Sequence, residues 1–270
     1  MVDTEHGRTI TVRRVVDDRI DTVEQVFEHG IMTGITALDE ARAFLSTTKA
    51  RGAKARVQQA LDTATVDRAL PTSPVVSELL AGAPLRGGAV YSVQGSTALV
   101  MALMAGPSAE GAWCGVVGMP SFGAEAAQAL GVDLERLVLV PEPGPEWLSV
   151  VAALVDALSV VVVRPPGEVT PGEASRLAAR LRTRGALLIA SGSWPGSEAR
   201  LEIESNTWTG LGDGEGLLAA RQATVAVTTR RAGTTPRRHH LWLPAPDGTL
   251  HTITPPALSA APTWQEEAVG

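Results

Sequence analysis

The chain has 270 residues, of which 44% are hydrophobic and 19% are charged, and its formal net charge at pH 7 is −6. This composition is typical of a folded globular protein, long enough for one large domain or for one domain with appendages. The negative net charge argues against a protein that coats nucleic acid through its overall field, but it leaves local basic patches open.

Three absences predict a cytoplasmic protein. Residues 1–5 (MVDTE) lack the apolar core of a signal peptide. No stretch approaches the roughly 18 apolar residues of a membrane-spanning helix. Cys114 is the single cysteine, so it excludes an intramolecular disulfide and favours a reducing compartment.

The chain before the main core is expected to have two parts. Residues 1–35 are predicted to be an appendage, and Met32 is a candidate for the native start of translation. Residues 36–70 are predicted to be an N-terminal helical region, because Thr36 can cap a helix whose apolar residues recur at helical spacing. A weak helical stripe in the appendage consists of Val16, Ile20, Val23 and Phe27.

A basic run lies inside the predicted N-terminal helical region. Its residues are Lys49, Arg51, Lys54 and Arg56. Such a run is typical of a solvated helix end, and it is also what a contact to a phosphate backbone requires. Both interpretations stay open.

Residues 71–254 predict one α/β core with its C-terminal strands. Short, continuous apolar runs alternate with helical segments, as expected when helices cover both faces of a mostly parallel sheet. The helix predicted at 172–184 is well marked, because Thr170 and Glu173 form a capping box and Gly185 follows its end. The other helices are expected at 98–105, 124–130 and 147–158, and the strands at 89–93, 112–117, 137–140, 160–163 and 186–190.

The remainder of the chain changes its pattern. Alternating runs at 200–208, 217–229 and 239–243 predict half-exposed strands that extend the sheet in antiparallel fashion. Residues 255–270 are rich in Pro, Ala and Ser and are expected to be a flexible tail. Core packing does not account well for Trp264 in such a tail, so we expect Trp264 to contact a partner.

Several motifs in this core resemble a known family. Residues 131–143 are similar to the segment between the second helix and the third strand of RecA recombinases, and the order of elements fits a RecA core. Over about residues 37–250 the chain resembles the actinobacterial ImuA-prime proteins, the RecA-like accessory subunits of the translesion mutagenesis machinery. The motifs shared with that family are Trp113-Cys114, Gly144-Pro145-Glu146-Trp147, Val163-Arg164-Pro165-Pro166-Gly167, Trp194-Pro195-Gly196, Gly210-Leu211-Gly212-Asp213-Gly214 and Leu241-Trp242-Leu243-Pro244.

The resemblance implies a fold and a role. It implies a RecA-like, mostly parallel sheet flanked by helices, and a part in DNA damage-induced mutagenesis during the SOS response. The implied partner is ImuB, a Y-family-polymerase-like adaptor, and through it an error-prone C-family polymerase and the sliding clamp. The implied location is the cytoplasm, with association to the nucleoid during DNA damage.

The turn that would bind nucleotide lacks its lysine. A working phosphate-binding loop reads G-x-x-x-x-G-K-[ST], so that backbone amides wrap the phosphates and the lysine neutralises them. Here the turn is Gln94-Gly95-Ser96-Thr97, which is too short to wrap and has serine before Thr97. Ser96 and Thr97 are expected to cap the following helix, or else to present their hydroxyls to an anion.

Two further positions of a RecA-type ATPase also lack their acids. No carboxylate follows the second strand before Glu125, which falls inside the next helix. The fourth strand ends in Arg164, where a carboxylate would be needed to hold Mg²⁺. We expect Arg164 to pair with Asp156 or Glu168, and the alternative is a phosphate contact at the carboxyl edge of the sheet. The sequence therefore predicts no catalytic residue and no cofactor.

A second basic group brackets a predicted hairpin loop. Its residues are Arg230, Arg231, Arg237 and Arg238. Arginines around one turn can meet phosphate oxygens, or they can belong to a plain solvated loop. His239 and His240 follow directly, but adjacent strand residues point to opposite faces, so no metal site is expected.

The expected function is that of a non-catalytic scaffold in error-prone translesion synthesis that binds the Y-family-polymerase-like adaptor. Two other functions stay open. One is a protein that binds DNA directly or regulates a recombinase through the two basic groups. The other is an ATPase that switches with nucleotide despite its degenerate loop.

Overall fold

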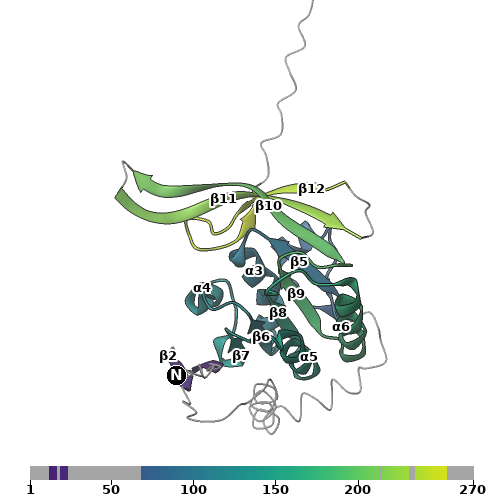
Figure 1. The fold of residues 1–270 in the computed structure, drawn as a ribbon. Helices are drawn as coiled ribbons and strands as arrows, with labels where there is room; N and C mark the ends of the chain where they lie inside the picture. The colour runs from purple at the N-terminus through teal and green to yellow at the C-terminus, as the bar shows by residue number, and fades with distance from the viewer. Residues whose placement is uncertain (1–11, 17–18, 24–67, 213–214, 231–234, 254–270) are drawn as a thin grey trace, which may run out of the picture.

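The computed structural model describes residues 12–16, 19–23, 68–212, 215–230 and 235–253. In these residues one sheet of eleven strands has the order β13-β12-β11-β10-β5-β9-β8-β6-β7-β1-β2 (Figure 1). Its centre is parallel and consists of β5 (Val90–Gln94), β9 (Leu187–Ser191), β8 (Val160–Val163), β6 (Cys114–Val117) and β7 (Leu137–Val140). A separate pair, β3 (Ala69–Leu70) and β4 (Leu85–Arg86), is antiparallel.

Helices cover both faces of the parallel centre. On one face, α2 (Pro74–Leu79), α3 (Thr97–Ala109) and α4 (Ala124–Ala129) contribute to a single buried cluster, and the 3-10 turn η1 (Leu134–Arg136) joins it. On the other face lie α5 (Trp147–Ala157) and α6 (Pro171–Arg184). Every side chain of β8 is buried, which explains why this strand is a continuous run of valines.

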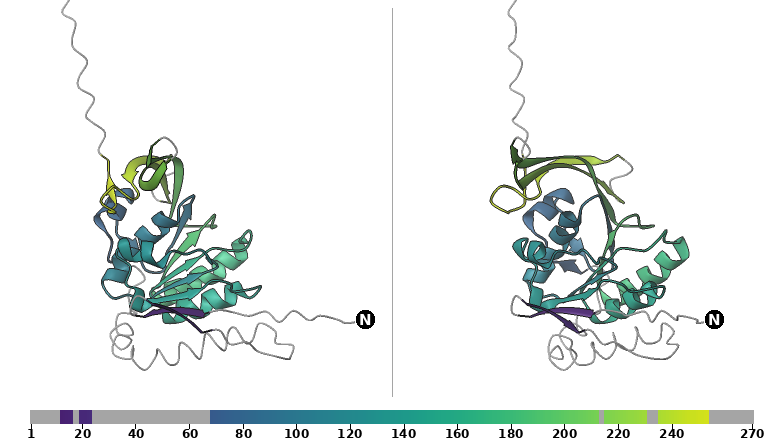
Figure 2. Two further views of the ribbon diagram at one scale, coloured as in Figure 1. Left: turned by 90° about the vertical axis from the view of Figure 1, so that its left-hand side faces the viewer. Right: turned by 60° about the vertical axis from the view of Figure 1, so that its left-hand side comes forward.

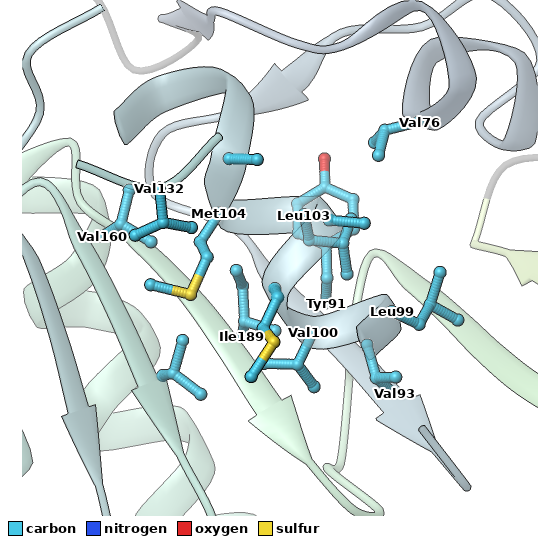
Figure 3. Close-up of a cluster of buried hydrophobic side chains, with 14 of the residues drawn as sticks. Val76, Tyr91, Val93, Leu99, Val100, Leu103, Met104, Val132, Val160 and Ile189 are labelled. Atoms are coloured by element: carbon cyan, nitrogen blue, oxygen red, sulfur yellow. The ribbon is translucent and has the colours of Figure 1, made fainter. Parts of the chain in front are cut away.

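The first of these clusters packs around α3. Leu99, Val100 and Leu103 of the helix are fully buried, and Tyr91 and Val93 of β5 lie beside them (Figure 3). Helix α3 runs to Ala109, past Pro107, and is therefore longer than predicted. The buried hydroxyl of Ser108 near its end accepts a hydrogen bond from the Asp133 N–H at 2.9 Å.

The predicted fold class is confirmed. The chain has a mostly parallel sheet flanked by helices, and antiparallel strands follow at its C-terminal side. The strands predicted at 137–140 and 160–163 have those bounds, and the others differ by a few residues. The capping box of α6 is present, with Thr170 and Glu173 in the predicted roles and Gly185 in the left-handed conformation.

The prediction for the N-terminal appendage is wrong in one respect. The weak helical stripe does not form a helix, because Val16 lies in β1 (Val12–Val16) and Ile20 lies in β2 (Arg19–Val23). These strands pair with each other, and β1 pairs antiparallel with β7 at Arg13↔Leu139 and Arg14↔Val138. Strands β1 and β2 thus extend the sheet by their backbone hydrogen bonds, which strand residues can form in spite of a helix-like spacing of apolar residues. The predicted helical region at 36–70 lies almost wholly outside the described residues.

The antiparallel extension is dominated by one long hairpin. Strand β10 (Ala199–Gly212) pairs in parallel with β5 only from Ala199 to Glu202, and β11 (Glu215–Thr229) pairs with β12 (Arg237–Trp242) only from Gln222 to Val227. The strand β13 (His251–Thr252) completes this side. Residues 208–212 and 215–221 therefore form a two-stranded projecting ribbon that extends beyond the body of the sheet (Figures 1 and 2).

In the parts of the chain that the structure describes, no helix is long and apolar enough to cross a membrane.

We predict a large difference in stability between two leucine-to-alanine substitutions. Leu103→Ala removes a fully buried side chain beneath α3 and should lower the free energy of unfolding by about 2 to 5 kcal/mol. Leu218→Ala changes a side chain that is 52% exposed on the projecting ribbon and should change it by less than about 0.5 kcal/mol. Urea unfolding followed by circular dichroism measures both. Equal effects would contradict the assignment of the core.

Candidate functional site

The turn between β5 and α3 is tight and well capped. Gly95 has a φ of +81°, a conformation that favours glycine, and Ser96 follows as the N-cap residue of α3. The Ser96 hydroxyl oxygen accepts a hydrogen bond from the Leu99 N–H at 3.2 Å. The prediction that Ser96 caps this helix is confirmed, whereas Thr97 is the first helical residue and not the cap.

An arginine from the opposite end of the chain reaches this turn. Arg221 lies on β11, and its Nη2 donates a hydrogen bond to the Ser96 Oγ at 2.9 Å. The backbone of Arg221 is fixed as well, because its N–H donates to the Pro244 carbonyl at 2.8 Å and its carbonyl accepts from the Leu243 N–H at 2.7 Å. The guanidinium group therefore lies at the amino end of α3, where a phosphate-binding turn would hold its anion.

The surroundings of Arg221 are unusual for a cation. Its guanidinium lies 5.4 Å from the ring centroid of Trp208, the residue opposite it on β10. Its Nε is buried without a hydrogen-bond partner, and burial lowers the pKa of the group. None of the described carboxylates forms an ion pair with it. The charge is thus held by an indole face and a hydroxyl group.

Sequence reasoning missed Arg221. The available signal was the charge of Arg221, because every other residue between Glu215 and Arg230 is uncharged. A charged residue in such a strand does not indicate which helix it will face, because β11 pairs with β10 and β12 and meets α3 only in the tertiary structure. The contact to Ser96 spans 125 residues of sequence.

The other two positions of a nucleotide site have no clustered acids. The residue after β6 and Gly118 is Met119, which is buried, and Glu125 lies in the first turn of α4. After β8, Arg164 donates from Nε and Nη2 to the Ser191 Oγ at 3.4 and 3.3 Å. Arg164 thereby bridges the carboxyl ends of the neighbouring strands β8 and β9.

The predicted pairing of Arg164 with Asp156 or Glu168 is wrong. Asp156 is engaged by α6, because Arg180 donates to both its carboxylate oxygens and Arg184 donates to one of them at 3.1 Å. Helix α5 ends at the opposite edge of the sheet from Arg164, which follows the carboxyl end of β8, so Asp156 is out of reach for a topological reason. The hydrogen bond from Arg180 and the charges of Arg180 and Arg184 lower the pKa of Asp156.

The predicted phosphate contacts are only partly described. Lys49, Arg51, Lys54, Arg56 and Arg231 lie outside the described residues, as does Trp264. Arg230 is exposed directly after β11, and Arg237 and Arg238 are exposed on β12. Arg238 is already engaged, because it donates to both carboxylate oxygens of Glu204 at 2.8 and 2.9 Å. Phosphate binding by these groups stays a prediction.

The tryptophans and the cysteine divide between core and surface. Trp194, which follows β9, is 2% exposed and belongs to the core with α5 and α6. Trp208 is 42% exposed on the projecting ribbon. Cys114 is fully buried, and burial raises its pKa to about 12.

The two adjacent histidines are in different environments. The Nε2 of His239 is buried without a partner and burial lowers the pKa of that imidazole, whereas the Nδ1 of His240 lies 3.2 Å from the Thr224 hydroxyl. Within the described ranges, no group of three or more His, Cys, Asp or Glu side chains could hold a metal ion.

Comparisons with known proteins give a family and a set of structural neighbours. A family described as the MT3502 N-terminal domain matches residues 78–196. The uncharacterized protein Rv3395c of Mycobacterium tuberculosis is 33% identical over 142 residues, which cover 47% of this chain and 70% of that protein. A crystal structure of the RadB recombinase superposes with a TM-score of 0.47 and 13% identity, over 67% of this chain and 97% of that one.

We predict that one hydroxyl of the turn is structural and its neighbour is not. Ser96→Ala removes the cap of α3 and the acceptor of the Arg221 hydrogen bond, so it should lower the free energy of unfolding by about 1 to 2 kcal/mol. The matched control Thr97→Ala leaves both interactions in place and should have an effect of less than about 0.5 kcal/mol. Urea unfolding measures both changes, and a larger effect for Thr97→Ala would contradict the cap.

We also predict that Asp156 makes stability depend on pH. Because its pKa is lowered in the folded state, Asp156 contributes stability above its unfolded pKa of about 3.9, and the contribution is lost as pH falls through the folded value. The difference in stability between the unaltered chain and Asp156→Asn should therefore shrink as pH falls from about 6 to about 3. Thermal melts across this range measure it, and a constant difference would refute the linkage.

Proposed function

The chain belongs to the family of the Mycobacterium tuberculosis protein Rv3395c, and we propose that it acts as a non-catalytic, RecA-like scaffold in error-prone translesion synthesis. In this proposal it binds a Y-family-polymerase-like adaptor and does not hydrolyse nucleotide. The observation that carries the proposal is the contact between Arg221 and Ser96 at the amino end of α3.

The Arg221 contact supports the proposal that this turn binds a side chain of its own chain in place of a nucleotide phosphate. In a phosphate-binding turn the amino end of the helix attracts an anion, and a lysine neutralises the phosphates. Here the turn holds a cation of its own chain through the Ser96 hydroxyl, and both lysines of the chain lie upstream at positions 49 and 54. Entry of a nucleotide phosphate would require that the Ser96 hydroxyl give up its hydrogen bond to the guanidinium.

A second arginine at the carboxyl edge of the same sheet supports the loss of metal chemistry. Mg²⁺ in phosphoryl transfer is held by carboxylates, whereas the end of β8 presents Arg164, whose guanidinium is hydrogen-bonded to Ser191. A fixed cation there would repel the metal ion. The two arginines therefore favour a RecA-like fold that serves as a binding surface.

The role in translesion synthesis rests on the sequence resemblance to the ImuA-prime proteins. Two motifs of that resemblance lie at the ends of strands: Trp194-Pro195-Gly196 follows β9, and Gly210, Leu211 and Gly212 are the last residues of β10. The adaptor, the C-family polymerase and the clamp enter as partners through that resemblance.

We expect the chain to form a stable complex with its adaptor in the absence of nucleotide. The test is co-purification of the two proteins at moderate salt, without nucleotide and then with Mg-ATP. Equal recovery under both conditions supports the scaffold. Recovery only with Mg-ATP would show a nucleotide-switched protein and overturn the non-catalytic part of the proposal. Failure under both conditions would overturn the adaptor-binding part.

The salt dependence of DNA affinity distinguishes the DNA-binding alternative from the scaffold. If the basic residues carry the function, affinity for a DNA oligonucleotide should fall steeply as salt rises, because each phosphate contact releases counterions. Under the scaffold proposal, fluorescence anisotropy with a labelled oligonucleotide should show no steep salt dependence. Arg237→Ala, which changes an exposed arginine, should then leave the anisotropy unchanged.

A further inference from the structure

The projecting ribbon exposes apolar side chains that the fold does not need. The large hydrophobic residues exposed in the described parts of the chain are Trp208 on β10 and Leu218 on β11, at 42% and 52% exposure. Both lie on the ribbon, beyond the point where β5 and β12 pair with these strands. An exposed tryptophan outside the core is a common anchor of protein interfaces.

The ribbon also lacks the support that a sheet normally gives. Past Glu202, no described strand pairs with the outer edge of β10, and none pairs with β11 before Gln222. A two-stranded ribbon is marginally stable in water by itself. The pairing of β10 with β11 nevertheless continues to Gly212↔Glu215 through two register shifts, between Ile203 and Ser205 and between Thr209 and Leu211. Something beyond strand pairing has to hold it.

Arg221 supplies that hold and fixes Trp208 at the same time. The guanidinium group is bound to the Ser96 hydroxyl on one side and lies over the indole ring of Trp208 on the other. Trp208 thus needs little further ordering on binding, and pre-ordering of an anchor lowers the entropic cost of association. Tryptophan and arginine are also the residues most enriched at interface hot spots.

The charge at this place indicates the chemistry of the occupant. Arg221 is half-buried and none of the described carboxylates pairs with it, so the face of the ribbon that carries Trp208 has an uncompensated cation. The opposite face is different. On that side, next to the ribbon, the hairpin has a hollow of about 270 Å³ with polar walls from Thr207, Gln222, Thr224 and neighbouring residues, and Arg238 of β12 forms an ion pair with Glu204 of β10.

We propose that the Trp208 face of the projecting ribbon docks a protein segment that carries carboxylates beside a large apolar side chain. The apolar side chain would pack on the free face of the Trp208 indole, and a carboxylate would compensate Arg221. This inference rests on the proposed function, in that the segment belongs to the Y-family-polymerase-like adaptor. It names the surface that the adaptor contacts.

The test compares two neighbouring residues of one strand. Trp208→Ala should weaken binding of the full-length adaptor by about tenfold or more, as expected for a central tryptophan anchor. Thr207→Ala should leave it unchanged, because successive side chains of a strand point to opposite faces. Isothermal titration calorimetry with the full chain gives both affinities, and circular dichroism confirms that each variant is folded.

A second experiment tests whether the docked segment must carry a carboxylate. Arg221→Gln removes the cation, so it should weaken binding and make the remaining affinity less dependent on salt. Ser96→Ala keeps Arg221 and Trp208 but removes the hydrogen bond between Arg221 and the Ser96 hydroxyl. The affinity of this variant for the adaptor should therefore depend on salt as the affinity of the unaltered chain does. Equal salt dependence of the unaltered chain and Arg221→Gln would overturn the acidic nature of the segment.

The outcomes separate this inference from the function on which it rests. If the unaltered chain binds the adaptor and Trp208→Ala binds equally well, the docking surface is overturned and the scaffold function stands. If the unaltered chain does not bind at all, both are overturned. If Trp208→Ala loses affinity for a labelled single-stranded DNA oligonucleotide and keeps its affinity for the adaptor, the face binds nucleic acid by base stacking and the proposal is overturned.

Discussion

The burial of β5, β6, β7, β8 and β9 on both faces is the constraint on which the rest of this structure depends. Parallel strands covered by helices on each side leave only the ends of the strands free for polar groups. The turn with Ser96 and the side chain of Arg164 both lie at the carboxyl ends of these strands. Their positions follow from the requirement that the valine and leucine runs stay out of water.

Strand β10 links this buried centre to the exposed surface. Its first residues pair in parallel with β5, and the remainder turns into an antiparallel hairpin with β11. Because β11 returns along β10, it brings Arg221 to the amino end of α3. One hydrogen bond thus connects a turn that would bind nucleotide in an active ATPase with a ribbon that exposes Trp208. The same geometry accounts for the proposed loss of catalysis and for the proposed docking surface.

Much of the fold could be predicted from local patterns. The run of four valines in β8 and the capping box of α6 have strong signals, because a buried parallel strand has no polar alternation and a capped helix has a fixed spacing of Thr170 and Glu173. The partner of Arg164 could not be predicted. Asp156 is closer in sequence than Ser191, but the two ends of a parallel sheet separate Asp156 from Arg164, and sequence distance does not record this.

By itself, the sequence determined that this chain forms a helix-covered, mostly parallel sheet and that its turn at Gly95 has no lysine. Both are local properties, since apolar runs, caps and a missing residue can be recognised without knowledge of what lies beside them. Only the tertiary structure decided that Arg221 takes a place beside Ser96, that Trp194 is core and that Trp208 is surface. These placements depend on contacts between residues far apart in the chain. Such contacts are set by which strands pair and in which register, and the local sequence around each residue does not reveal that pairing.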